Sequence, residues 1–182
     1  MGAGTGGLTK VLVPALASLG VPVEYTFTDL SSSMVAQAKK KFGKYPFMKY
    51  VVHDIEKAPS DPQLIGSQHI VIASNAVHAT HSLKASTEKI RQFLRPDGFL
   101  VLLEMMEPLH WIDVVWGTLE GWWLFDDGRT HAIVDEKRWK KDLLAAGYKH
   151  VEWTDGNIVE NRLQRVLIVS YLFALVFSSH GP

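Results

Sequence analysis

The chain has 182 residues, of which 47% are hydrophobic and 21% charged, a composition typical of one globular domain of ordinary size. Basic and acidic residues number 19 each, so the formal net charge is zero and nothing indicates a nucleic-acid or anionic-lipid partner. The absence of cysteine excludes disulfides, thiolate metal ligands and a cysteine nucleophile. We therefore expect a single domain over residues 1–182, in the cytoplasm.

Neither end of the chain predicts a membrane segment. Met1 leads directly into the glycine-rich segment 2–7, without the basic and apolar regions of a signal peptide. The apolar run 166–177 is shorter than the about 20 residues that a helix needs to cross a bilayer. We expect a buried strand with an apolar extension there, followed by a frayed terminus at 178–182.

Apolar runs and helical patterns alternate along the chain, which predicts an α/β fold around a mostly parallel sheet. The apolar run 70–73 is typical of a central strand that is covered on both faces, and Arg-Pro-Asp-Gly at 95–98 predicts a turn. The expected elements are a helix over 8–19, a strand over 23–28, a helix capped by Ser31 or Ser32, strands over 48–52 and 70–73, a helix over 82–94, a strand over 99–103, a helix over 135–146, and strands over 150–153 and 165–171.

Polar residues follow the expected strands at the points where each strand ends. Ligands of open α/β sheets bind beyond the carboxyl ends of the strands, so these residues should share one edge of the sheet. They are the glycine loop 2–7, Asp29, Asp54, Asn75 with His78, and Glu104.

The glycine loop and Asp29 together predict a nucleoside site. Glycines allow a ligand to approach the main chain, and the helix that follows presents free N–H groups to an anion. Asp29 ends the next strand, from which a carboxylate accepts hydrogen bonds from a ribose diol. Asp54 is placed to accept from an adenine amino group. The alternatives are a plain glycine turn, a helix cap at Asp29 and a turn aspartate at Asp54.

His78 and Glu104 are the candidate acid–base pair. Histidine titrates near neutrality, and a carboxylate fixes its tautomer and stabilises its charged form. The alternative for His78 is a structural histidine. His81 lies three residues further on, a spacing that a metal pair could use, but no third ligand stands out and we expect no metal.

Residues 107–129 differ from the rest because four tryptophans lie between positions 111 and 123. They could form ordinary core at helical spacing. We favour a lid over an apolar or aromatic substrate.

These motifs in combination resemble the C-methylation domain of fungal iterative polyketide synthases, with the non-reducing synthases the most similar. The resemblance covers residues 1–169, and residues 170–182 diverge. It rests on Gly2–Gly7, Tyr25–Asp29, His53–Lys57, Ala73–Thr80, Leu94–Gly98 with Leu102–Glu104, and Leu119–Trp123.

The resemblance implies a Rossmann-like class I methyltransferase sheet with flanking helices and S-adenosylmethionine as methyl donor. It also implies methylation of the α-carbon of a β-ketoacyl chain, with an acyl carrier protein or a polyketide synthase as partner. Asn75 joins the cofactor residues through its place at a strand end. The implied roles are Gly2, Gly4 and Gly6 along the methionine part, Asp29 on the ribose, Asp54 by the adenine, His78 as base and Glu104 orienting it.

The sequence departs from this family at its beginning. In the family, a strand that ends in an acidic residue precedes the glycine loop, and a helical region that helps to enclose the substrate precedes that strand. Here Met1 takes their place, so we expect the first strand to be missing. The other hypotheses are an O-methyltransferase that acts in a tailoring step, a truncated non-catalytic remnant of a synthase and, least favoured, a nicotinamide dehydrogenase.

Overall fold

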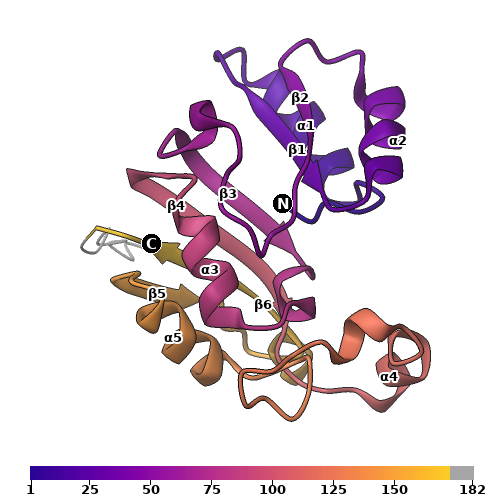
Figure 1. The fold of residues 1–182 in the computed structure, drawn as a ribbon, viewed down its shortest axis with the longest axis vertical. Coiled ribbons are helices and arrows are strands. Elements are labelled where there is room, and N and C mark those ends of the chain that lie inside the picture. The colour runs from indigo at the N-terminus through magenta and orange to yellow at the C-terminus, as the bar shows by residue number, and fades with distance from the viewer. Residues whose placement is uncertain (173–182) are drawn as a thin grey trace.

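A computed structural model describes residues 1–172 of the chain as an α/β structure with two sheets (Figure 1). The elements are α1 (Thr9–Ser18), β1 (Tyr25–Asp29), α2 (Ser32–Phe42), β2 (Met48–Val52), η1 (Pro62–Leu64), β3 (Gln68–Ser74), η2 (Val77–Ala79), α3 (Leu83–Arg91), β4 (Leu94–Met105), α4 (His110–Trp116), η3 (Glu120–Trp123), α5 (Glu136–Ala145), β5 (His150–Trp153), η4 (Val159–Arg162) and β6 (Gln164–Ser170).

The strands form one sheet of two and one of four. Strands β1 and β2 pair in parallel, while the larger sheet has the order β3-β4-β6-β5. Its β3–β4 pair is parallel, whereas β6 runs antiparallel to both β4 and β5. The four-stranded sheet is therefore mixed, whereas the sequence suggested a mostly parallel sheet.

The first three residues connect the two sheets. The Met1 amine donates a hydrogen bond to the carbonyl of Ile72 in β3, and the Ala3 N–H donates to the carbonyl of Thr28 in β1. Burial lowers the pKa of the Met1 amine to about 6, against the opposing charge of Asp29. Within residues 1–172 no strand pairs with both β1 and β3.

The larger sheet holds the main hydrophobic core. Burial alternates along β4, and its residues Leu100 and Leu102 are fully buried. Helices α3 and α5 pack against each other over this face (Figure 1). Trp139 of α5 and Leu167 of β6 complete the centre of the core.

A smaller core lies between the two-stranded sheet and its helices. Phe27 of β1 packs with Val13 of α1 and with Phe42 of α2. Ser31 starts α2 by accepting a hydrogen bond from the Met34 N–H, as one of the two expected caps.

One local expectation is wrong, and another is met only in part. Residues 95–98 fall inside β4, but Leu94 pairs with Gln68 and Phe99 with Ile70, so these four residues form a bulge without β3 partners at the position of the expected turn. The run 70–73 is not covered on both faces, since Val71 and Ala73 are buried while Ile70 is 56% exposed.

The C-terminal apolar run is described only as far as β6 and Leu172. Its extension to 177 and the expected frayed terminus lie outside the described residues. Within residues 1–172 no helix is both long enough and apolar enough to cross a membrane.

Candidate active site

The site forms where the glycine loop meets the carboxyl ends of β1, β3 and β4. Gly2, Gly4 and Gly6 all have positive φ, between 52° and 77°, which side chains rarely tolerate. A Cβ on Gly2 would lie 2.6 Å from the Cβ of Ala76, in the loop after β3. The loop therefore packs directly against the segment that carries His78.

Asp29 fixes the other side of the glycine loop. One carboxylate oxygen accepts a hydrogen bond from the Gly4 N–H at 2.7 Å, and the other accepts from the Ser31 N–H at 2.9 Å. Each oxygen keeps a second lone pair, so the carboxylate can still accept from a diol. Asp29 does not cap α2 with its side chain in the way that Ser31 does.

The start of α1 has no side-chain cap. Leu8 precedes the helix, whereas α2, α3 and α5 begin with Ser31, Ser82 and Asp135 as caps. The N–H groups of Lys10 and Val11 already donate to the carbonyls of Gly6 and Leu8. A Cβ on Gly4 would meet no atom within 4 Å. Open space beside the glycine loop and a nearby carboxylate fit a nucleoside that carries an amino acid.

Asp54 and Asn75 lie at the same edge, but both already have protein partners. Asp54 accepts a hydrogen bond from the Glu56 N–H, as a turn aspartate does, and pairs with Lys57 at 3.4 Å. Asn75 has a φ of +47°, and its side-chain oxygen accepts a hydrogen bond from the Gln164 amide. Each side chain retains further hydrogen-bonding capacity.

His53, which precedes Asp54, is buried and packs edge-on against Phe93. Burial lowers the pKa of this histidine, although the Asp54 charge opposes the change. The lowered pKa favours the neutral form of His53, which carries no charge.

His78 and Glu104 meet in the interior, as the sequence suggested. Nδ1 of His78 lies 2.7 Å from one oxygen of Glu104, whose residue is fully buried. The other oxygen of Glu104 accepts hydrogen bonds from the N–H groups of Ala76 and Val77, at 3.2 and 3.0 Å. The carboxylate thus holds both the ring and the backbone just before it.

The tautomer of His78 follows from this geometry. A carboxylate only accepts, so Nδ1 carries the hydrogen and Nε2 keeps its lone pair. No hydrogen bond to Nε2 is formed within residues 1–172. The ring of Trp122 packs edge-on against the histidine, with centroids 5.3 Å apart. The arrangement suits a proton acceptor.

The sequence placed Trp122 only within the expected lid, and it did not identify Asp127 or Arg129 as parts of this region. Arg129 bonds the carbonyl of His78, 51 residues away along the chain. No local pattern marks such a contact. His81 pairs with Glu56 instead of a metal, and no cluster of three or more potential metal ligands occurs among residues 1–172.

Known proteins have similar sequences and the same fold. The family described as "Methyltransferase domain" matches residues 1–100. The chain belongs to the methyltransferase-domain family. Its methyl donor is S-adenosylmethionine, and the chemistry of the glycine loop, α1 and Asp29 fits that group.

The relatives are fungal. The non-reducing polyketide synthase sorB of Penicillium rubens is 79% identical over 168 residues, which are 92% of this chain and 6% of that protein. The non-reducing polyketide synthase sor2 of Hypocrea jecorina is 74% identical with the same coverage. The expected resemblance to domains of such synthases is confirmed, and the chain spans 6% of the length of these relatives.

Two solved structures sharpen the comparison. The CMeT domain of the citrinin polyketide synthase has a TM-score of 0.92 and 57% identity, over 94% of this chain and 45% of that one. The trans-methyltransferase CalH, in complex with SAH, has a TM-score of 0.79 and 30% identity, over 92% of this chain and 48% of that one. The Rossmann-like class I fold is therefore confirmed.

Proposed function

We propose that this chain transfers a methyl group to the carbon between the two carbonyls of a β-ketoacyl thioester, as a C-methylation domain of fungal polyketide biosynthesis. The observation that carries the proposal is the buried His78–Glu104 pair beside the glycine loop. The similarity to a carbon-methylating synthase domain at 57% identity supports carbon as the acceptor. The acyl chain would arrive on an acyl carrier protein.

Each half of the site would hold one reactant. Gly2, Gly4 and Gly6 would line the methionine part of S-adenosylmethionine, Asp29 the ribose, and Asp54 the adenine, with Asn75 at the same edge. When bound, this donor supplies an electrophilic sulfonium methyl group. The residues after β3 and β4 would hold the acceptor.

The chain's own part in the chemistry is proton removal. Nε2 of His78 would take the α-proton of the acceptor, which leaves an enolate. Its α-carbon would attack the sulfonium methyl group, whose carbon–sulfur bond would break so that S-adenosylhomocysteine leaves. Glu104 would hold the Nδ1–H toward itself and stabilise the imidazolium that forms, since it already accepts three hydrogen bonds in the interior. Trp122 would exclude water beside the ring.

The test uses the 182-residue chain, S-adenosylmethionine and the acetoacetyl thioester of N-acetylcysteamine. We expect a product that gains one methylene in mass, with the new methyl group on carbon 2. His78→Asn should reduce the rate about 10²-fold or more and keep the affinity for S-adenosylhomocysteine. His69→Asn, at an exposed histidine near the start of β3, is the matched control and should leave the rate unchanged.

Three results would overturn the proposal: no methyl transfer by the wild-type chain, methylation on oxygen, or full activity of His78→Asn. The first would indicate a non-catalytic chain, and the second a different acceptor atom. The third would remove His78 from the role of base.

A further inference from the structure

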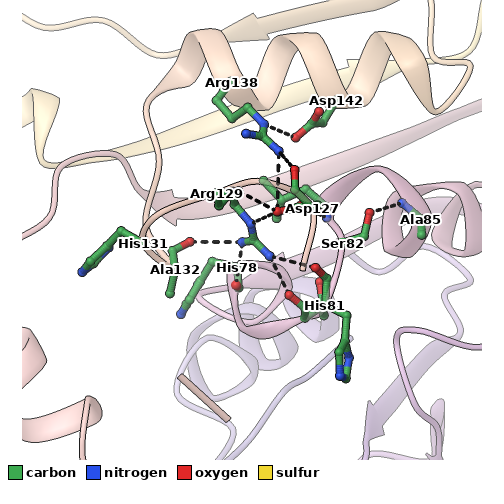
Figure 2. Close-up of polar contacts among 12 residues, drawn as sticks. His78, His81, Ser82, Ala85, Asp127, Arg129, His131, Ala132, Arg138 and Asp142 are labelled. Carbon is green, nitrogen blue, oxygen red and sulfur yellow. Dashed lines mark hydrogen bonds and ion pairs between the residues drawn. The ribbon is translucent and has the colours of Figure 1, made fainter. Parts of the chain in front are cut away.

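Arg129 is a buried cation that contacts the backbone of the segment carrying His78. Its side chain is fully buried, and Nη1 donates hydrogen bonds to the carbonyls of His78, at 2.9 Å, and Ala132, at 3.2 Å. Nη2 donates to the carbonyl of Thr80 at 2.6 Å and lies 3.5 Å from that of His81 (Figure 2). One guanidinium therefore holds the segment from His78 to His81 at several points.

The carbonyl of His78 belongs to the short helix η2, and those of Thr80 and His81 lie between η2 and α3, outside any helix or strand ladder. A buried carbonyl without a donor costs about 1–3 kcal/mol. The rigid, planar fork of arginine donors spans several such carbonyls at once, over a wider distance than the compact ammonium of a lysine. Arg129 thus defines the path of the backbone directly after the candidate base.

Asp127 neutralises Arg129 and extends its hold to α3. One oxygen accepts a hydrogen bond from Nε of Arg129 at 2.7 Å, and the other accepts from the N–H of Leu83, the first residue of α3, at 3.0 Å. The segment 78–83 is therefore held at its carbonyls by Arg129 and at its end by Asp127. Both residues come from the loop between η3 and α5, and Figure 2 shows their contact.

Arg138 of α5 forms the outer layer of this cluster. It donates hydrogen bonds to the carbonyl of Asp127 at 2.8 Å and to the Asp142 carboxylate at 2.6 Å. The two arginines and two aspartates balance in charge, so burial of the cluster leaves no uncompensated ion. The cluster joins α5, α3 and the His78 segment into one rigid unit.

We propose that Arg129 is a positioning residue for the methyl transfer, acting through the carbonyls of His78 and Thr80. This inference rests on the proposed role of His78 as base. Glu104 fixes the histidine ring through Nδ1, and Arg129 holds the backbone carbonyl of the same residue. Two anchors are needed because one hydrogen bond alone leaves the ring free to pivot about it. Together they set the direction in which Nε2 meets the acceptor.

The test compares Arg129→Gln and Arg129→Lys with Arg95→Gln, an exposed arginine that also pairs with an aspartate, as the matched control. Rates with the acetoacetyl thioester are divided by the number of sites that bind S-adenosylhomocysteine in a titration, so that unfolded molecules do not count. We expect Arg129→Gln to lower kcat per binding site about tenfold or more and to change cofactor affinity little. Arg129→Lys should retain part of the rate, and Arg95→Gln all of it.

A spectroscopic signature separates positioning from bulk stability. The Nδ1–H of His78 should give a downfield proton resonance in its short hydrogen bond with Glu104, and Arg129→Gln should broaden or shift it in the folded protein. An unchanged kcat per binding site with an unchanged resonance would overturn the inference, even if the melting temperature falls. If Arg129→Gln does not fold, Asp127→Asn takes its place: a lower kcat per site with an altered resonance would support the inference, and no change in either would overturn it.

The outcomes for the two proposals are distinct. Loss of activity in His78→Asn with full kcat per site in Arg129→Gln would leave the base in place and refute the positioning role. Full activity in His78→Asn would refute the proposed base itself, whatever Arg129→Gln does.

Discussion

The two sheets of the molecule differ in how firmly they are built. The four-stranded sheet packs two helices over a core that includes fully buried Leu100, Leu102 and Trp139. The two-stranded sheet has a smaller core around Phe27, and its helix α1 leaves Val11 67% exposed. The candidate base thus follows a strand of the larger sheet, while Asp29, which binds the glycine loop, ends a strand of the smaller one. A site assembled from both can bind its cofactor only when the two are joined.

The largest effect should come from removing core side chains in each half. Phe27→Ala and Leu102→Ala each remove a fully buried side chain, at a cost of about 2–5 kcal/mol of unfolding free energy. All six tryptophans lie after residue 110, so tryptophan fluorescence reports on the larger half, while circular dichroism reports on both. In urea titrations we expect Leu102→Ala to shift both signals and Phe27→Ala to shift mainly the dichroism. Equal shifts of the fluorescence midpoint by the two variants would show that the halves unfold as one.

A smaller effect should come from the glycine loop at the junction. Gly2→Ala and Gly4→Ala introduce similar backbone strain, since both glycines have φ near +55°. Only the methyl group on Gly2 would collide with Ala76, whereas that on Gly4 enters open space. We expect Gly2→Ala to lower the unfolding free energy by about 1–2 kcal/mol more, and Gly4→Ala to weaken S-adenosylhomocysteine binding about tenfold while stability changes less. Denaturation measures the loss of stability, and calorimetric titration measures the loss of binding. If the two variants lost stability and affinity to the same extent, the expectation would be refuted.

The smallest effect concerns an exposed ion pair that bridges the halves. Glu56 follows β2 and pairs with His81, which follows η2, at 2.9 Å. The hydrogen bond that His81 donates to the Glu56 carboxylate, followed by the charge of that carboxylate, raises the pKa of His81 above 6.5. The bridge is therefore complete below pH 6.5, and its charge is lost as the pH rises through the raised pKa. NMR titration should give a pKa for His81 that falls toward 6.5 in Glu56→Gln. An identical His81 pKa in the wild type and in Glu56→Gln would refute the ion pair between the two residues.

Much of the fold could be predicted from the sequence because its signals are local. The strand over 48–52 matches β2, and glycines and caps delimit α1 and α2 close to their predicted ends. The turn expected at 95–98 is a bulge inside β4, because the strand resumes its pairing with β3 at Phe99. The prediction that both faces of β3 are covered was wrong. An apolar run does not reveal whether helices pack on one face of the strand or on both.

Some residues of the candidate site could likewise be predicted from the sequence, and others could not. Asp29, His78 and Glu104 could be found because each ends an expected strand, and topology brings strand ends together. Arg129 could not, because its partners are main-chain carbonyls, which any sequence supplies. The roles of all these residues stay predictions, as do those of Asp54, which accepts from the nearby Glu56 N–H, and of Asn75, which accepts from Gln164.

The central claim is that S-adenosylmethionine binds at the junction of the two sheets, and amide hydrogen exchange with and without S-adenosylhomocysteine tests it most directly. We predict that saturating ligand slows exchange together at residues 2–8, at 29–31 beyond β1 and at 75–78 beyond β3, with little change in β5. Protection limited to one sheet, or protection confined to α5 and β5, would contradict a site built from both.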